Sequence, residues 1–78
     1  MQEKIKKCDN INIGANIRAI RKKQRISQTE LVAKLQLKGI SITREALVKI
    51  ENGRQHINAA QLLSIRDALN TTYDELIK

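Results

Sequence analysis

The sequence lacks the residues that give many small proteins covalent or metallic support. Its 78 residues include one cysteine, Cys8, and one histidine, His56. These two side chains cannot form an intrachain disulfide or a four-ligand zinc site. We therefore expect no metal and no cofactor. A chain this short must then be stabilised by economical packing of secondary structure or by a partner.

Long apolar runs and enzyme signatures are also missing. No stretch of about 18 apolar residues could cross a membrane, and the opening segment MQEKIKKCDN has no apolar core of a secretory signal. We therefore expect an intracellular, cytoplasmic protein, and a lone thiol fits that reducing compartment. An enzyme is not expected, because the chain has no glycine-rich phosphate loop and no clustered carboxylates.

Aromatic residues are almost absent. Tyr73 is the only one, and there is no proline, phenylalanine or tryptophan. The core must therefore be built from isoleucine, leucine, valine and alanine. Ile13, Ile17 and Ile20 are spaced with the period of an α-helix, which predicts a first helix over about 12–24. The same kind of spacing later in the chain predicts an all-α domain.

Two capped helices separated by a short turn lie in the middle of the chain. A capping box, Ser-x-x-Glu, begins at Ser27 and starts a helix over about 28–38, after which Gly39 is the natural left-handed residue. Thr43 can cap the next helix, over about 44–52, and a glycine follows it. This arrangement is typical of a DNA-binding helix-turn-helix.

Two more helix starts follow. We expect capping boxes at Asn58 to Gln61 and at Thr72 to Glu75. Five helices joined by short loops predict one compact domain over 12–78. Residues 1–11 are polar and basic with few apolar side chains, and we expect them to form a flexible tail.

The formal net charge of +7 is unevenly distributed. Residues 1–54 contain 13 Lys or Arg against 5 acids, whereas residues 55–78 contain 2 against 3. The basic part therefore coincides with the helix-turn-helix pattern, which indicates a polyanionic partner. Double-stranded DNA is the expected partner, because its major groove accommodates an α-helix.

Three segments match one family in order and spacing: IGANIRAIRKKQRISQTEL, KIENG and LLSIRDALNTTYDELI. Over roughly residues 12–77 the sequence resembles the lambda repressor and Cro-like regulators, the xenobiotic-response-element family of bacterial and phage transcription factors. The resemblance implies a five-helix lambda-repressor-like fold and a sequence-specific regulator of the repressor type. A palindromic operator and a homodimer are implied too, since such domains read paired half-sites. The alternative is an antitoxin or a docking module whose main partner is another protein.

The sequence departs from the family pattern at three places. The segment QLKGI is inserted before the recognition helix, and Val32 and Arg66 replace small residues. We expect a longer second helix, a wider crossing of the second and third helices at Val32, and a charge at the edge of the core at Arg66.

The outward face of the 44–52 helix is expected to read bases. The resemblance implies base contacts by Arg44, Glu45 and Lys49, and the helical wheel independently places Glu45 and Lys49 outward. Arg44 and Lys49 could bind guanine, and Glu45 could accept from cytosine N4. Val48 could contact a thymine methyl group. The alternative is a solvated surface with an ion pair between Glu45 and Lys49 worth a few tenths of a kcal/mol.

Other residues are expected to hold the DNA backbone. Gln28 can donate to a phosphate that the exposed amides and dipole of its helix attract. The resemblance implies further backbone contacts, with two lysines as additional candidates: Ser27, Thr43, Asn52, Arg54, Gln55, Lys22 and Lys23. For Ser27 and Thr43, helix capping alone is the alternative role.

Arg21 and Glu51 lie on helix flanks that face the core side. In proteins that this chain resembles, an arginine of the first helix pairs with the glutamate of the ENG motif. A structural ion pair between Arg21 and Glu51, which fixes the end of the recognition helix, is therefore implied.

Overall fold

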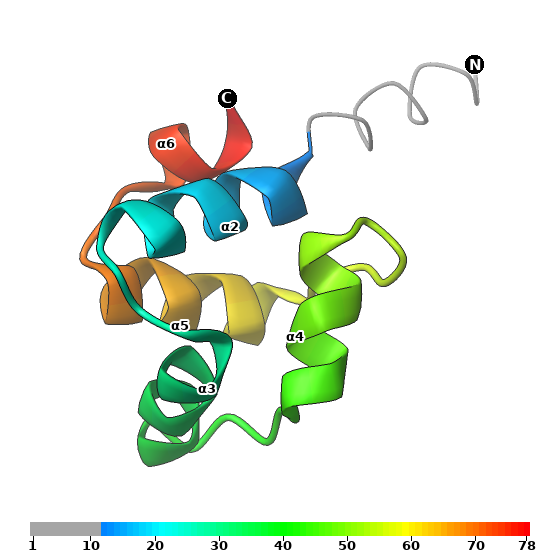
Figure 1. Cartoon of the computed structure of the whole chain (residues 1–78), viewed down its shortest axis with the longest axis vertical. Coiled ribbons are helices and arrows are strands. Elements are labelled where there is room, and N and C mark those ends of the chain that lie inside the picture. Colours follow the sequence, from blue (N-terminus) through cyan, green and yellow to red (C-terminus); the bar gives the residue numbers. More distant parts are fainter. Residues whose placement is uncertain (1–11) are drawn as a thin grey trace.

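The computed structural model describes residues 12–78, and this range contains helices and no strand (Figure 1). The helices are α2 (Ile13–Lys23), α3 (Gln28–Leu37), α4 (Arg44–Glu51), α5 (Ala59–Leu69) and α6 (Tyr73–Ile77). The expected all-α, five-helix architecture is confirmed. The tail expected over residues 1–11 lies outside the described residues. Within the described range, no helix is long and apolar enough to cross a membrane.

Helices α3, α4, α5 and α6 begin with a side-chain cap, whereas Asn12 before α2 makes no side-chain cap hydrogen bond. The boxes at Ser27 and Asn58 are complete, since in each the cap side chain and the third helical side chain accept each other's backbone N–H. Thr72 Oγ1 accepts from the Glu75 N–H at 3.2 Å. The Glu75 carboxylate, however, pairs with Lys78 Nζ at 3.1 Å. The third expected box is therefore a single cap, because an ion pair holds its carboxylate.

Helices α2, α3, α4 and α5 end in the same way. A left-handed residue follows each of them, and the next residue donates its N–H to a carbonyl of the last turn at 2.8 to 3.1 Å. The left-handed residues are Arg25 (φ 61°), Gly39 (86°), Gly53 (77°) and Asn70 (53°). This is the Schellman arrangement, which glycine adopts without steric cost and asparagine tolerates. Arginine has neither of these advantages in the left-handed conformation.

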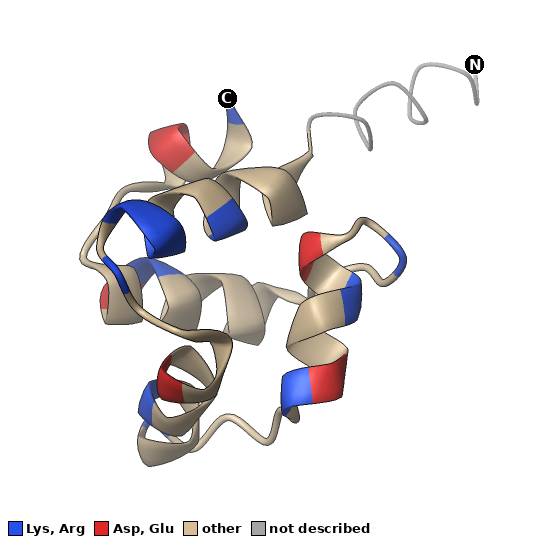
Figure 2. Cartoon of the chain, in the orientation of Figure 1, with Lys and Arg blue, Asp and Glu red and all other residues tan. Residues whose placement is uncertain are grey.

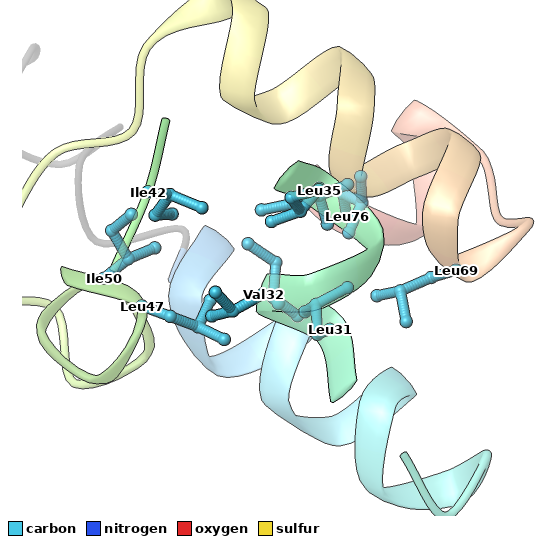
Figure 3. Packing of buried hydrophobic residues seen from close by; sticks show 10 residues of the cluster. Leu31, Val32, Leu35, Ile42, Leu47, Ile50, Leu69 and Leu76 are labelled. Carbon is cyan, nitrogen blue, oxygen red and sulfur yellow. The ribbon is translucent and has the colours of Figure 1, made fainter. Parts of the chain in front are cut away.

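The core is aliphatic and lies between all five helices (Figure 3). Val32 is only 7% exposed, so the valine that replaces a small residue is part of this core. Leu62 is half-buried and packs against the edge of this core. The buried hydrophobic residues are Ile17, Leu31, Val32, Leu35, Ile42, Leu47, Ile50, Ile65, Leu69 and Leu76.

The inserted segment QLKGI continues α3 and then forms the turn. Leu37, the last residue of α3, is 89% exposed. The turn is fixed to the domain at two points. Gln36 Nε2 donates to the Ile42 carbonyl at 3.1 Å, and Ile42 is buried at 4% exposure. The start of α4 is therefore anchored in spite of the longer connection.

Arg66 lies at the edge of the core, as expected. Its side chain is 32% exposed, and Nη2 is 2.9 Å from Asp67 Oδ1. The guanidinium carbon lies 4.6 Å from the centre of the Tyr73 ring. The hydrogen bonds that the Arg66 guanidinium donates to Asp67 Oδ1 raise the pKa of the guanidinium. A carboxylate and the chain's single aromatic ring thus accommodate this charge.

Gly14 allows α2 to approach the end of α4 closely. It is buried, and a Cβ atom added to it would overlap the carbonyl oxygen of Ile50. Two residues further along α2, Asn16 Nδ2 donates to the Leu76 carbonyl at 2.7 Å and holds α6 against α2. Helix α2 thereby contacts both α4 and α6.

Replacing Arg25 by glycine should stabilise the protein. The left-handed conformation costs an arginine about 1 kcal/mol more than a glycine, and the more flexible unfolded chain of the variant offsets part of the gain. We expect Arg25→Gly to raise the free energy of unfolding in urea by roughly 0.5–1 kcal/mol. Gly39→Ala is the matched control and should lower it. A less stable Arg25→Gly variant would contradict this view of the end of α2.

Replacing Gly14 by alanine should destabilise the protein although alanine favours helices. The added methyl group meets backbone atoms that cannot move independently, so we expect a loss of about 1–3 kcal/mol in the free energy of unfolding. Ala19→Gly, at an exposed position of the same helix, should cost only about 1 kcal/mol through helix propensity. A Gly14→Ala variant as stable as the parent would show that the contact with Ile50 is not close.

Candidate nucleic-acid interface

Helix α4 forms one side of the molecule and packs against α2 and α3 (Figure 1). Its inner face is buried through Leu47 and Ile50, which are 0% and 2% exposed. Arg44, Glu45 and Lys49 are exposed, whereas the fourth predicted base reader, Val48, is half-buried. Because its other face is fixed in the core, α4 presents these side chains from a rigid support.

Helix α4 carries charges of both signs (Figure 2), and of these Arg44, Glu45 and Lys49 are exposed. Within residues 12–78, no ion pair joins Glu45 to Lys49, so the ion pair of the alternative interpretation is not formed. Thr43 Oγ1 accepts from the Ala46 N–H at 3.0 Å. The N–H groups of Arg44 and Glu45 precede the first intrahelical hydrogen bond and point out of the helix start.

The predicted phosphate-binding residues fall into three groups. Ser27 and Gln28 begin α3, and Thr43 begins α4. Lys22 and Lys23 are exposed in the last turn of α2. The remaining three follow the end of α4 and are exposed: Asn52, Arg54 and Gln55. Helix starts, a basic helix end and an exposed loop are all places from which DNA-binding domains contact the backbone.

Ser27 and Gln28 have internal partners in the structure. The Ser27 hydroxyl accepts from the Glu30 N–H at 3.0 Å. Gln28 is half-buried, and its Nε2 donates to Glu51 Oε1 at 3.1 Å. The contact between Gln28 and Glu51 was not foreseen from the sequence, because helix spacing alone does not show that the start of α3 meets the end of α4.

A hollow lies between the start of α2 and the loop after α4. Asn52 and Gln55 line it together with Asn12 and His56. Sequence patterns had assigned no role to Asn12 or His56. Within residues 12–78, no group of three potential metal-ligating side chains lies close enough to hold an ion.

A buried ion pair joins α2 to the end of α4. Arg21 Nε lies 2.8 Å from Glu51 Oε2, and Arg21 Nη2 lies 2.9 Å from Glu51 Oε1. The two side chains are 9% and 1% exposed. The implied contact between Arg21 and Glu51 is thus present as a two-point contact, which fixes orientation as well as distance.

The same arginine also reaches the start of α3. Arg21 Nη1 donates to the Ile26 carbonyl at 2.8 Å, one residue before the N-cap of α3. With the bond from Gln28 to Glu51, three segments meet at one buried charge pair: α2, the start of α3 and the end of α4. The relative placement of the two helices of the helix-turn-helix therefore depends on this cluster.

Comparison with known families gives a match over most of the chain. The model of a helix-turn-helix family matches residues 17–76. This range contains α3 and α4 completely, together with both members of the buried ion pair. A search of curated proteins and a search of solved structures found no match.

Removing one partner of the buried pair should destabilise the fold. Glu51→Ala leaves the Arg21 guanidinium buried without its carboxylate, and we expect a loss of about 3–5 kcal/mol in the free energy of unfolding, measured in urea. Glu45→Ala, at an exposed position of the same helix, should cost less than about 1 kcal/mol. Replacing both partners by methionine should recover most of the loss. An unchanged melting midpoint for Glu51→Ala would contradict a structural role.

Proposed function

The chain belongs to the lambda repressor and Cro-like helix-turn-helix family, and on this premise we propose that it is a sequence-specific regulator that binds double-stranded DNA and represses transcription. The family is one of DNA-binding regulatory domains and not of enzymes. The observation that supports the proposal best is the exposed face of α4, which carries Arg44, Glu45 and Lys49 while its opposite face is buried.

In this proposal α4 enters the major groove and reads bases. Arg44 makes a two-point contact with guanine O6 and N7, and Lys49 contacts a guanine at one point. Glu45 accepts a hydrogen bond from cytosine N4, an interaction that offsets the repulsion between its carboxylate and the phosphates. Val48, which is half-buried, adds apolar contact with a thymine methyl group.

Phosphate contacts hold α4 in register. Gln28 donates from the start of α3, where the helix dipole favours an anion. Exposed residues of the loop after α4 and the two lysines at the end of α2 supply further phosphate contacts. Ser27 and Thr43 cap their helices and also lie near the DNA backbone. The complete set of proposed phosphate-binding residues is Lys22, Lys23, Ser27, Gln28, Thr43, Asn52, Arg54 and Gln55.

We propose a palindromic operator read by two copies of the chain. A homodimer places two recognition helices in successive major grooves about 34 Å apart on one side of the duplex. The cell compartment that this function requires is the cytoplasm of a bacterium, where a chromosomal or phage operator is accessible.

Selection of bound duplexes from a random pool at physiological salt tests the function directly. The expected result is an enriched palindromic sequence whose half-sites lie about one helical turn apart. Enrichment of no sequence would overturn sequence-specific binding. If the chain binds no duplex but co-purifies in stoichiometric amount with the product of a neighbouring gene, it is an antitoxin or a docking module instead.

Two substitutions should separate base reading from phosphate binding. Arg44→Ala should lose discrimination at one base pair by about 1–3 kcal/mol, while Arg54→Ala should weaken binding to all sequences similarly and reduce the salt dependence. The measurement is the affinity of each variant at several salt concentrations for three duplexes: the selected one, one with a single base-pair substitution and a scrambled one. Equal losses by both variants on every duplex would reject base reading by α4.

A further inference from the structure

We propose that Glu51 is a positioning residue for DNA binding, which holds the amide of Gln28 ready to donate to a phosphate. The inference rests on the proposed function and extends it, because the buried ion pair then acts on the backbone contact as well as on the fold. Its basis is the hydrogen bond of 3.1 Å from Gln28 Nε2 to Glu51 Oε1.

The hydrogen bond uses only part of what the amide can donate. A glutamine Nε2 carries two N–H groups, and Glu51 accepts one of them. Gln28 is only half-buried, so part of the residue remains accessible from outside the molecule. The second N–H lies in the amide plane and points away from the carboxylate. It can therefore donate to a phosphate oxygen without loss of the internal bond.

The acceptor is itself held firmly. Glu51 is 1% exposed at its side chain, and the Arg21 guanidinium holds both of its oxygens. Rotation of this carboxylate would break two charge-assisted bonds. Gln28 is thus hydrogen-bonded to a carboxylate that is fixed in position. The side chain of Gln28 is therefore restricted before DNA binds.

The ion pair also prevents an electrostatic penalty. An isolated carboxylate behind Gln28 would repel an approaching phosphate. The Arg21 guanidinium neutralises Glu51 at 2.8 and 2.9 Å, and Arg21 Nη1 holds the Ile26 carbonyl just before α3. The phosphate therefore meets a neutral, ordered amide at a helix start whose dipole is favourable.

Restricting the Gln28 side chain before binding should have a measurable effect on DNA affinity. Ordering an unrestrained glutamine side chain opposes binding by up to about 30-fold, whereas a hydrogen bond to a charged group contributes about tenfold or more. A free Gln28 would thus add little to affinity, and a restrained one would add most of its hydrogen bond.

A double-mutant cycle tests this coupling. Gln28→Met is made in the natural protein and in the Arg21→Met/Glu51→Met background, which removes the acceptor but keeps an apolar contact there. Affinity is measured on the selected duplex and on a scrambled one. In the natural protein, Gln28→Met should lower affinity about tenfold on both duplexes. In the background without the ion pair, the loss should fall below about threefold. Arg54→Met is the matched control, with equal losses in both backgrounds.

The outcomes separate the proposals. Equal losses for Gln28→Met in both backgrounds overturn the positioning role of Glu51. No loss in a natural protein that still selects its duplex overturns the phosphate contact of Gln28, and failure of the natural protein to bind any duplex overturns the proposed function. Side-chain amide NMR of the natural protein gives a second test that needs no folded double variant. Duplex should shift the Gln28 N–H that is not bonded to Glu51, and no shift would overturn the proposal.

Discussion

The buried pair of Arg21 and Glu51 is the interaction on which the rest of the structure depends. Its two bonds of 2.8 and 2.9 Å join α2 to the end of α4, and the third donor of the same guanidinium holds the chain before α3. Burying two charges has a large desolvation cost, which only complete pairing offsets. Partial formation is therefore unfavourable. Such a contact selects one arrangement of the helices over similar ones, even where it adds little net stability.

The remaining support comes from simple components. The core contains aliphatic residues alone, and four successive helices end with the same left-handed turn. Sharp helix ends keep the loops short, so a small domain can bury its apolar faces efficiently. Gly14 then lets α2 pack directly on the end of α4. The exposed face of α4 is a consequence of this packing, because the opposite face is buried against α2 and α3 through Leu47 and Ile50.

Local signals in the sequence predicted most of the fold. Caps at Ser27 and Thr43 depend on residues three positions apart, and such short-range chemistry can be read directly. Contacts between distant segments were harder to predict. The bond from Gln28 to Glu51, the close approach of helices at Gly14 and the stacking of Arg66 on Tyr73 all depend on how helices meet. The pair of Arg21 and Glu51 was anticipated only because the chain resembles a family that has it. Base-reading roles depend on a partner molecule and stay predictions.

Amide hydrogen exchange with and without the selected duplex tests most directly whether α4 and the start of α3 form the DNA-binding surface. At physiological salt, the account predicts slower exchange at the first amides of α3 and α4 and along the outward face of α4, because bound phosphates and bases cover them. The amides of α6 should be unchanged. Protection confined to α5 and α6, with none at α3 and α4, would contradict the account.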